Sequence, residues 1–86
     1  MALAHLHRID LGANMARFYC IDVAATLFGD VSIVRTWGRI GTHGRMSIET
    51  YATVEDAKKV ALQTLRDKIR RGYLPASQML PPDLAV

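Results

Sequence analysis

The alternation of apolar and polar residues predicts that the first half of the chain forms short β-strands. Residues 6–11, 17–23 and 31–39 are rich in β-branched, aromatic and other apolar side chains. Turn-forming residues separate these segments, around Gly12 and around Gly29. The segment 17–23 is apolar at both parities, so we expect it to lie near the centre of a sheet.

A fourth strand is predicted over residues 45–52, where the alternation is regular. One parity holds Met46, Ile48 and Ala52, and the other holds Arg45, Ser47, Glu49 and Tyr51. We expect the first set to pack and the second to face solvent, as in an antiparallel sheet that is covered on one side.

The second half of the chain contains one strong helix signal. Thr53 is a favourable N-cap, acidic residues follow it in the first turn, and Gly72 ends the segment. Residues at spacings of three and four form the stripe expected to pack on the sheet: Ala57, Val60, Ala61, Thr64, Leu65, Lys68 and Ile69. Prolines follow the helix, so we expect one domain over 1–74 and an extended or loosely ordered tail over 75–86.

Composition limits the classes of protein to which this chain can belong. Its 86 residues are half hydrophobic, which is typical of a single small globular domain. The one cysteine, Cys20, excludes an internal disulfide and a cysteine-clustered zinc site. It is compatible with the cytoplasm, where we expect the protein to act, at the nucleoid if it is bacterial. No signal-peptide pattern and no apolar stretch of about 18 residues is present, so we expect no membrane partner.

The basic residues are concentrated in the predicted helix. The chain has a formal net charge of +3, and residues 54–73 alone hold six basic and three acidic side chains. Such charges are typical of a solvated helix face. They would also add sequence-independent attraction to phosphates.

The segment 35–45 carries the most distinctive chemistry of the chain. It holds the only tryptophan, Trp37, together with His43 and no acidic residue. It also holds three arginines and three glycines, which are Arg35, Arg39, Arg45, Gly38, Gly41 and Gly44. Glycines at this spacing after a strand predict a tight turn, or room for another backbone to approach.

The strand period places Arg35 and Arg39 on the same face as Trp37. Because arginine is rarely buried without a partner, we expect an exposed indole on the side of the sheet that the helix leaves uncovered. A β-bulge at Gly38 would reverse this arrangement. Guanidinium groups suit phosphate oxygens, and an indole can stack on a base or sugar. The alternatives are that the tryptophan belongs to the core and that the arginines form an ordinary solvent-exposed face of the strand.

Together these features resemble the WGR domain, a family named after its Trp-Gly-Arg signature. The resemblance rests on Phe18-Tyr19, on Trp37-Gly38-Arg39-Ile40-Gly41 with Gly44, and on a helix with Ala57 that ends at Arg70-Arg71-Gly72-Tyr73. It runs from about residue 5 to residue 74. The family occurs in DNA-dependent poly(ADP-ribose) polymerases, in bacterial proteins of the molybdate-regulator type and as small free-standing bacterial proteins.

The resemblance implies an α+β fold, in which one main helix crosses one face of an antiparallel sheet of four to five strands. It also implies a nucleic-acid-binding module that grips DNA ends or nicks through sugar-phosphate contacts. By this resemblance Trp37 would pack on a sugar at a strand end, Arg39 would hold the domain on DNA, and Gly38 and Gly41 would allow close approach. The chain lacks the catalytic domain and zinc fingers of the polymerases, so no role in ADP-ribosylation follows.

The predicted DNA contacts combine the cluster with the resemblance, which adds Asn14 as a polar residue before the Phe-Tyr strand. They are Asn14, Arg35, Trp37, Gly38, Arg39, Gly41, His43 and Arg45. Nothing in the sequence reads base edges, so we expect binding without sequence preference. RNA is an alternative ligand. The alternative function is a protein-interaction or self-association module that uses the same open sheet face.

Other kinds of site find little support. His5, His7 and His43 lack a placed third ligand for a metal, and Cys20 fits a small buried hydrophobe. The glycine spacing is neither a dinucleotide fingerprint nor a phosphate loop, and no carboxylate pair stands out. We therefore predict a protein that is not an enzyme and that uses no metal or other cofactor.

Overall fold

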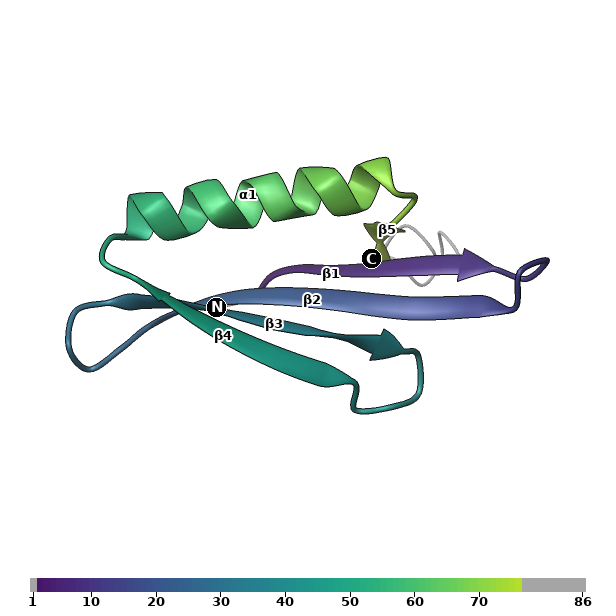
Figure 1. Ribbon diagram of the computed structural model, residues 1–86, viewed down its shortest axis with the longest axis horizontal. Helices are drawn as coiled ribbons and strands as arrows, with labels where there is room; N and C mark the ends of the chain where they lie inside the picture. The colour runs from purple at the N-terminus through teal and green to yellow at the C-terminus, as the bar shows by residue number, and fades with distance from the viewer. Residues whose placement is uncertain (1, 77–86) are drawn as a thin grey trace, which may run out of the picture.

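The computed structural model of the chain describes residues 2–76. Within them, five strands form one antiparallel sheet in the order β4-β3-β2-β1-β5, and a single helix lies across one face of it (Figure 1). The elements are β1 Ala2–Asp10, β2 Met15–Ala25, β3 Val31–Arg39, β4 Arg45–Tyr51, α1 Val54–Arg70 and β5 Leu74–Pro75. The predicted α+β fold is confirmed.

The strand boundaries differ from the predicted ones mainly at the first two strands. β3 spans the predicted residues, whereas β1 and β2 are longer because they pair with each other almost from end to end. The pairing of β2 with β3 is continuous from Arg17↔Arg39 to Ala25↔Val31, so no bulge interrupts it at Gly38. The side-chain parity predicted for β3 therefore holds.

The last described strand returns the chain to the sheet. β5 pairs with β1 at Leu6↔Pro75 and His7↔Leu74, so Pro75 belongs to the sheet rather than to a tail. The predicted tail beyond residue 76 lies outside the described residues.

The helix packs on the sheet through its smallest side chains. Ala57 and Ala61 are fully buried against a core of Leu6, Tyr19, Ile21, Val31, Ile33 and Tyr73. The hydroxyl oxygen of Thr53 accepts a hydrogen bond of 3.1 Å from the backbone N–H of Asp56, as the N-cap prediction requires. In residues 2–76 no helix is long and apolar enough to cross a membrane.

The helix covers the face of the sheet on which Trp37 lies, and this is the face that the sequence pattern predicts to be uncovered. Val31 and Ile33 are buried under α1, and Trp37 shares their parity, so the prediction that Trp37 lies on the uncovered side is wrong. The physical reason is that the apolar half of β3, with Tyr19 and Ile21 of β2, decides which face is buried. Arg35, at the same parity, follows that choice and lies on the helix side in a hollow with Tyr19 and Lys68.

The facing predicted for β4 is reversed as well. Met46 and Ile48 are 63% and 61% exposed on the uncovered side, while Tyr51 packs against the core. β4 is an edge strand, and its parity is set by register with β3, in which Tyr51 pairs with the buried Val31. The predicted alternation along β4 therefore holds, but the two sets of side chains face the opposite sides to those predicted.

Candidate functional site

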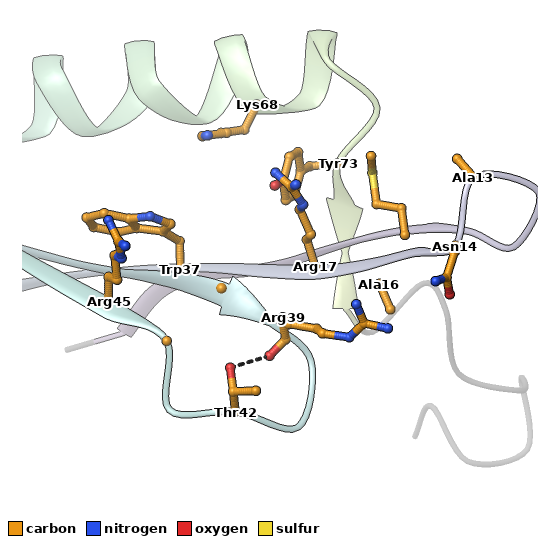
Figure 2. Close-up of a pocket in the computed structure, with 13 residues that line it drawn as sticks. Ala13, Asn14, Ala16, Arg17, Trp37, Arg39, Thr42, Arg45, Lys68 and Tyr73 are labelled. Atoms are coloured by element: carbon orange, nitrogen blue, oxygen red, sulfur yellow. Dashed lines mark hydrogen bonds between the residues drawn. The ribbon is translucent and has the colours of Figure 1, made fainter.

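A hollow of about 910 Å³ opens where the end of β3, the start of β2 and the last turns of α1 meet. Figure 2 shows the side chains that line it, and we call it the basic hollow. Its charged and aromatic lining residues are Arg17, Trp37, Arg39, Arg45, Lys68 and Tyr73. Four of these are cations, and none of the described residues that line the hollow is acidic.

Trp37 forms part of the wall of the basic hollow on the side of the sheet that faces the helix (Figure 2). Its side chain is half-buried and packs against the edge of the core. Its cross-strand neighbours are Tyr19 on β2 and Arg45 on β4. The indole is thus fixed by core packing while part of it still faces the hollow, as a stacking platform requires.

Lys68 reaches over the hollow from the helix (Figure 2). Its ammonium nitrogen lies 4.7 Å from the ring centroid of Tyr19 and 5.3 Å from that of Tyr73, which is cation–π geometry. Burial lowers the pKa of Lys68 from its ordinary value, and the nearby Arg71 and Arg17 lower it further. An ammonium held among other cations gains more than usual from an incoming anion.

Arg17 and Arg39 are cross-strand neighbours at the open end of the hollow, and both are exposed. Figure 2 shows the Arg17 side chain rising from β2 on the helix side, whereas Arg39 is directed away from Trp37 toward the end of the sheet that carries Asn14. The cations therefore surround the opening instead of gathering at one point. This spread fits a ligand with several charges along its length better than a single small anion.

The turn between β3 and β4 is shaped by glycines that approach other backbone closely. A Cβ on Gly44, whose φ is +73°, would overlap the carbonyl oxygen of Trp37. A Cβ on Gly38 would lie 2.7 Å from the Cα of Gly44. The Thr42 hydroxyl closes the turn by donating a hydrogen bond of 2.8 Å to the carbonyl oxygen of Arg39. These contacts require glycine and hold the turn beside the hollow.

Arg35 lies outside the basic hollow, on the other side of Trp37, and its guanidinium is paired with a carboxylate. It lines a separate hollow of about 330 Å³ with Tyr19, Ser47 and Lys68. Its guanidinium donates a hydrogen bond to Glu49, whose other carboxylate oxygen accepts one of 2.8 Å from the Tyr51 hydroxyl. These two hydrogen bonds, first that of Tyr51, lower the pKa of the Glu49 carboxyl.

The structure brings together five of the eight predicted contact residues. Asn14, Trp37, Gly38, Arg39 and Arg45 line the basic hollow. Arg35 lies in the adjacent hollow, Gly41 lines a hollow on the opposite face of the sheet, and the exposed His43 lines none of these three hollows.

Three charged or aromatic residues of the basic hollow are not among the predicted contacts: Arg17, Lys68 and Tyr73. Arg17 shares the parity of Tyr19 on β2, so a correct prediction of which face of β2 the helix covers would have placed Arg17 in the hollow. The helix pattern places Lys68 in the stripe that packs on the sheet. A lysine among apolar residues in that stripe is the one signal in the sequence that could have indicated a functional cation there. Tyr73 lies after the helix, where only the tertiary fold brings it beside Tyr19, with ring centroids 6.4 Å apart.

Comparison with known proteins gives a consistent result. Residues 2–79 match the family model described as the WGR domain. The chain is 44% identical over 71 residues to the uncharacterized protein y4dW of Sinorhizobium fredii, a match that covers 83% of this chain and 35% of that protein.

One solved structure supports the fold. A crystal structure of a protein from Bacteroides fragilis superposes with a TM-score of 0.70 over 99% of this chain, at 22% identity, and the match covers 21% of that structure. The chain thus spans about one third of y4dW and one fifth of the Bacteroides protein.

Proposed function

The chain belongs to the WGR domain family, and from this premise we propose that it is a non-catalytic module that binds DNA in the basic hollow. The observation that carries the proposal is a wall that combines four cations and two aromatic rings and that has no acidic side chain among residues 2–76. Arginine and lysine would contact phosphate oxygens, and the exposed part of Trp37 would pack against a sugar or base.

The shape of the hollow favours a strand end or nick over continuous duplex. Lys68 of α1 borders the hollow on one side, Thr42 and Gly44 of the β3–β4 turn border it on another, and Trp37 also lines it. In continuous duplex the bases are stacked and the sugars are followed by further backbone, whereas an end or nick leaves a terminal sugar free to enter. Binding would be independent of sequence because the cations address phosphates.

Fluorescence anisotropy with three labelled ligands tests this proposal: a nicked duplex with a 5′-phosphate, an intact duplex closed by hairpins at both ends, and a single strand. We expect the nicked duplex to bind most tightly and its affinity to fall steeply with added salt. A single-stranded RNA competitor separates DNA from RNA. Equal affinity for nicked and closed duplex would reject the preference for ends.

Variants locate the binding surface. Arg17→Ala, Arg45→Ala and Trp37→Ala should each weaken binding, and Lys59→Ala, on the exposed side of α1, should change it least. Because Trp37 also packs on the core, its variant is compared only after circular dichroism shows a folded protein. If Lys59→Ala weakens binding as much as the two arginine variants, the basic hollow is not the site.

The exposed side chains of the edge strand favour a second candidate function, a protein contact. Met46 and Ile48 present apolar surface on the uncovered face of the sheet, away from the basic hollow. Sedimentation of the free protein tests self-association. If Met46→Ser changes the oligomeric state while DNA affinity is unchanged, the two faces have separate roles.

A further inference from the structure

Two histidines lie side by side on the uncovered face of the sheet, opposite the basic hollow. His5 and His7 are two residues apart on β1, so they share a face. Their Nε2 atoms are 3.2 Å apart, and their rings meet edge to face with centroids 4.8 Å apart. His5 is exposed and His7 is half-buried, so solvent reaches the pair.

This separation matches two ligands of one metal ion. Zinc binds imidazole nitrogen at about 2.0–2.1 Å, so two nitrogens of a tetrahedral site lie about 3.3–3.4 Å apart. The observed 3.2 Å is within about 0.2 Å of that edge. As long as no metal is present, one ring must donate an N–H to the other, and a metal ion would take the place of this shared proton.

Strand pairing fixes the backbone that carries the two rings. β1 lies between β2 and β5, and its register with β2 is continuous at His5↔Cys20 and His7↔Phe18. His7 also pairs with Leu74 of β5. A ligand pair on a strand held from both sides loses little freedom when it binds, which favours affinity.

There is room for an ion and its remaining ligands. His5 and His7 line a hollow of about 270 Å³ with Phe18, Cys20 and Gly41. In the described part of the chain, no group of three or more His, Cys, Asp or Glu side chains is arranged to hold a metal. The other coordination positions would therefore belong to water or to an external ligand.

We propose that His5 and His7 form a two-histidine site for a divalent transition-metal ion of the class that favours imidazole, namely Cu²⁺, Ni²⁺ or Zn²⁺. The order of affinity follows ligand chemistry, with Cu²⁺ tightest. The pair lies on the other face of the sheet from Trp37, and Thr42 of the β3–β4 turn lines both this hollow and the basic hollow.

Isothermal titration calorimetry with NiCl₂ and with ZnCl₂ tests the site, using the full chain without an affinity tag in a non-coordinating buffer. We expect one ion per chain. His5→Ala and His7→Ala should each weaken binding by at least about tenfold, since a single imidazole cannot chelate. His43→Ala, which removes an exposed histidine outside the pair, is the matched control and should leave the affinity within about twofold.

Nitrogen-15 NMR of the histidine rings gives a second measurement that does not depend on substitutions. Zn²⁺ should shift the Nε2 resonances of His5 and His7 together and leave those of His43 in place. The proposal is overturned if no saturable binding occurs, if His43→Ala loses as much affinity as the other two variants, or if only one of the two rings responds.

Discussion

The guanidinium of Arg35 on β3 donates a hydrogen bond to the carboxylate of Glu49 on β4. The Arg35 side chain is only 16% exposed, whereas that of Glu49 is 48% exposed. The Arg35 Nε atom is buried and has no hydrogen-bond partner among the described residues. Glu49 therefore pairs with a cation that lines the same hollow as Trp37, and its carboxylate would repel a phosphate that approaches there.

From this arrangement we predict that Glu49→Gln tightens DNA binding. The change removes a negative charge near the hollow and leaves Arg35 beside a neutral amide, so the positive charge of Arg35 is no longer offset and affinity for nicked duplex should rise by roughly two- to fivefold at low salt. Glu55→Gln removes the same charge from the exposed first turn of α1 and is the matched control. An equal gain for both variants, measured by anisotropy, would show that only net charge matters.

The Arg35–Glu49 pair makes the free energy of unfolding depend on pH. Hydrogen bonds from Tyr51 and Arg35 favour the ionised form of Glu49, so its pKa is lower in the folded chain than the ordinary value of 4.5. The stabilisation is therefore complete above that value and is lost as the pH falls through the folded pKa. Thermal unfolding of the wild type and of Glu49→Gln should differ most near pH 7, and the difference should shrink as the pH falls below 4.5 and through the folded pKa of Glu49. A difference in stability that stays constant across this range would contradict the predicted direction of the Glu49 pKa shift.

Lys68 provides a prediction about salt dependence. Its ammonium lies over Tyr19 and Tyr73 in the basic hollow, and Lys68→Met keeps most of the stem while removing the charge. We expect weaker DNA binding and a slope of log affinity against log salt that is smaller by about one. Lys58→Met, on the exposed face of the helix, is the control. If both variants change the slope equally, Lys68 makes no contact of its own.

The turn beside Trp37 should tolerate substitution unevenly. Gly44→Ala combines a positive φ with overlap against the Trp37 carbonyl, so it should cost about 2–4 kcal/mol in the free energy of unfolding. Gly41→Ala has a φ of +96° but open space around the added Cβ, so it should cost about 1 kcal/mol. Urea unfolding measures both. Equal costs would mean that close approach at Gly44 does not limit the choice of residue.

Local signals predicted most of the elements. Strand β3, the Thr53 N-cap and the end of the helix near Gly72 follow from β-branched residues, a capping side chain and a glycine with a φ of +100°. Each of these depends on a few neighbouring residues. The resemblance to the WGR domain also rested on such local features, and the family match over residues 2–79 confirms it.

The facing of the sheet could not be predicted in the same way. Period two separates Trp37 from Thr36, but it does not say which set the helix covers. That choice depends on residues distant in sequence, since α1 must bury Ile21 and Ile33 together. Lys68 and Tyr73 joined the candidate site for the same reason, because the fold brings them to β2 and β3. Neighbouring residues are enough to tell which side chains share a face, but only the tertiary fold decides which face the helix covers.

The position of Trp37 has a practical consequence. Because the chain contains one tryptophan, and because its indole lines the basic hollow while packing on the core edge, its emission reports on this one place. A ligand that fills the hollow would displace water from the ring and alter both the intensity and the wavelength of emission. The molecule therefore carries an intrinsic optical reporter, with which occupancy of the hollow can be followed in unlabelled protein.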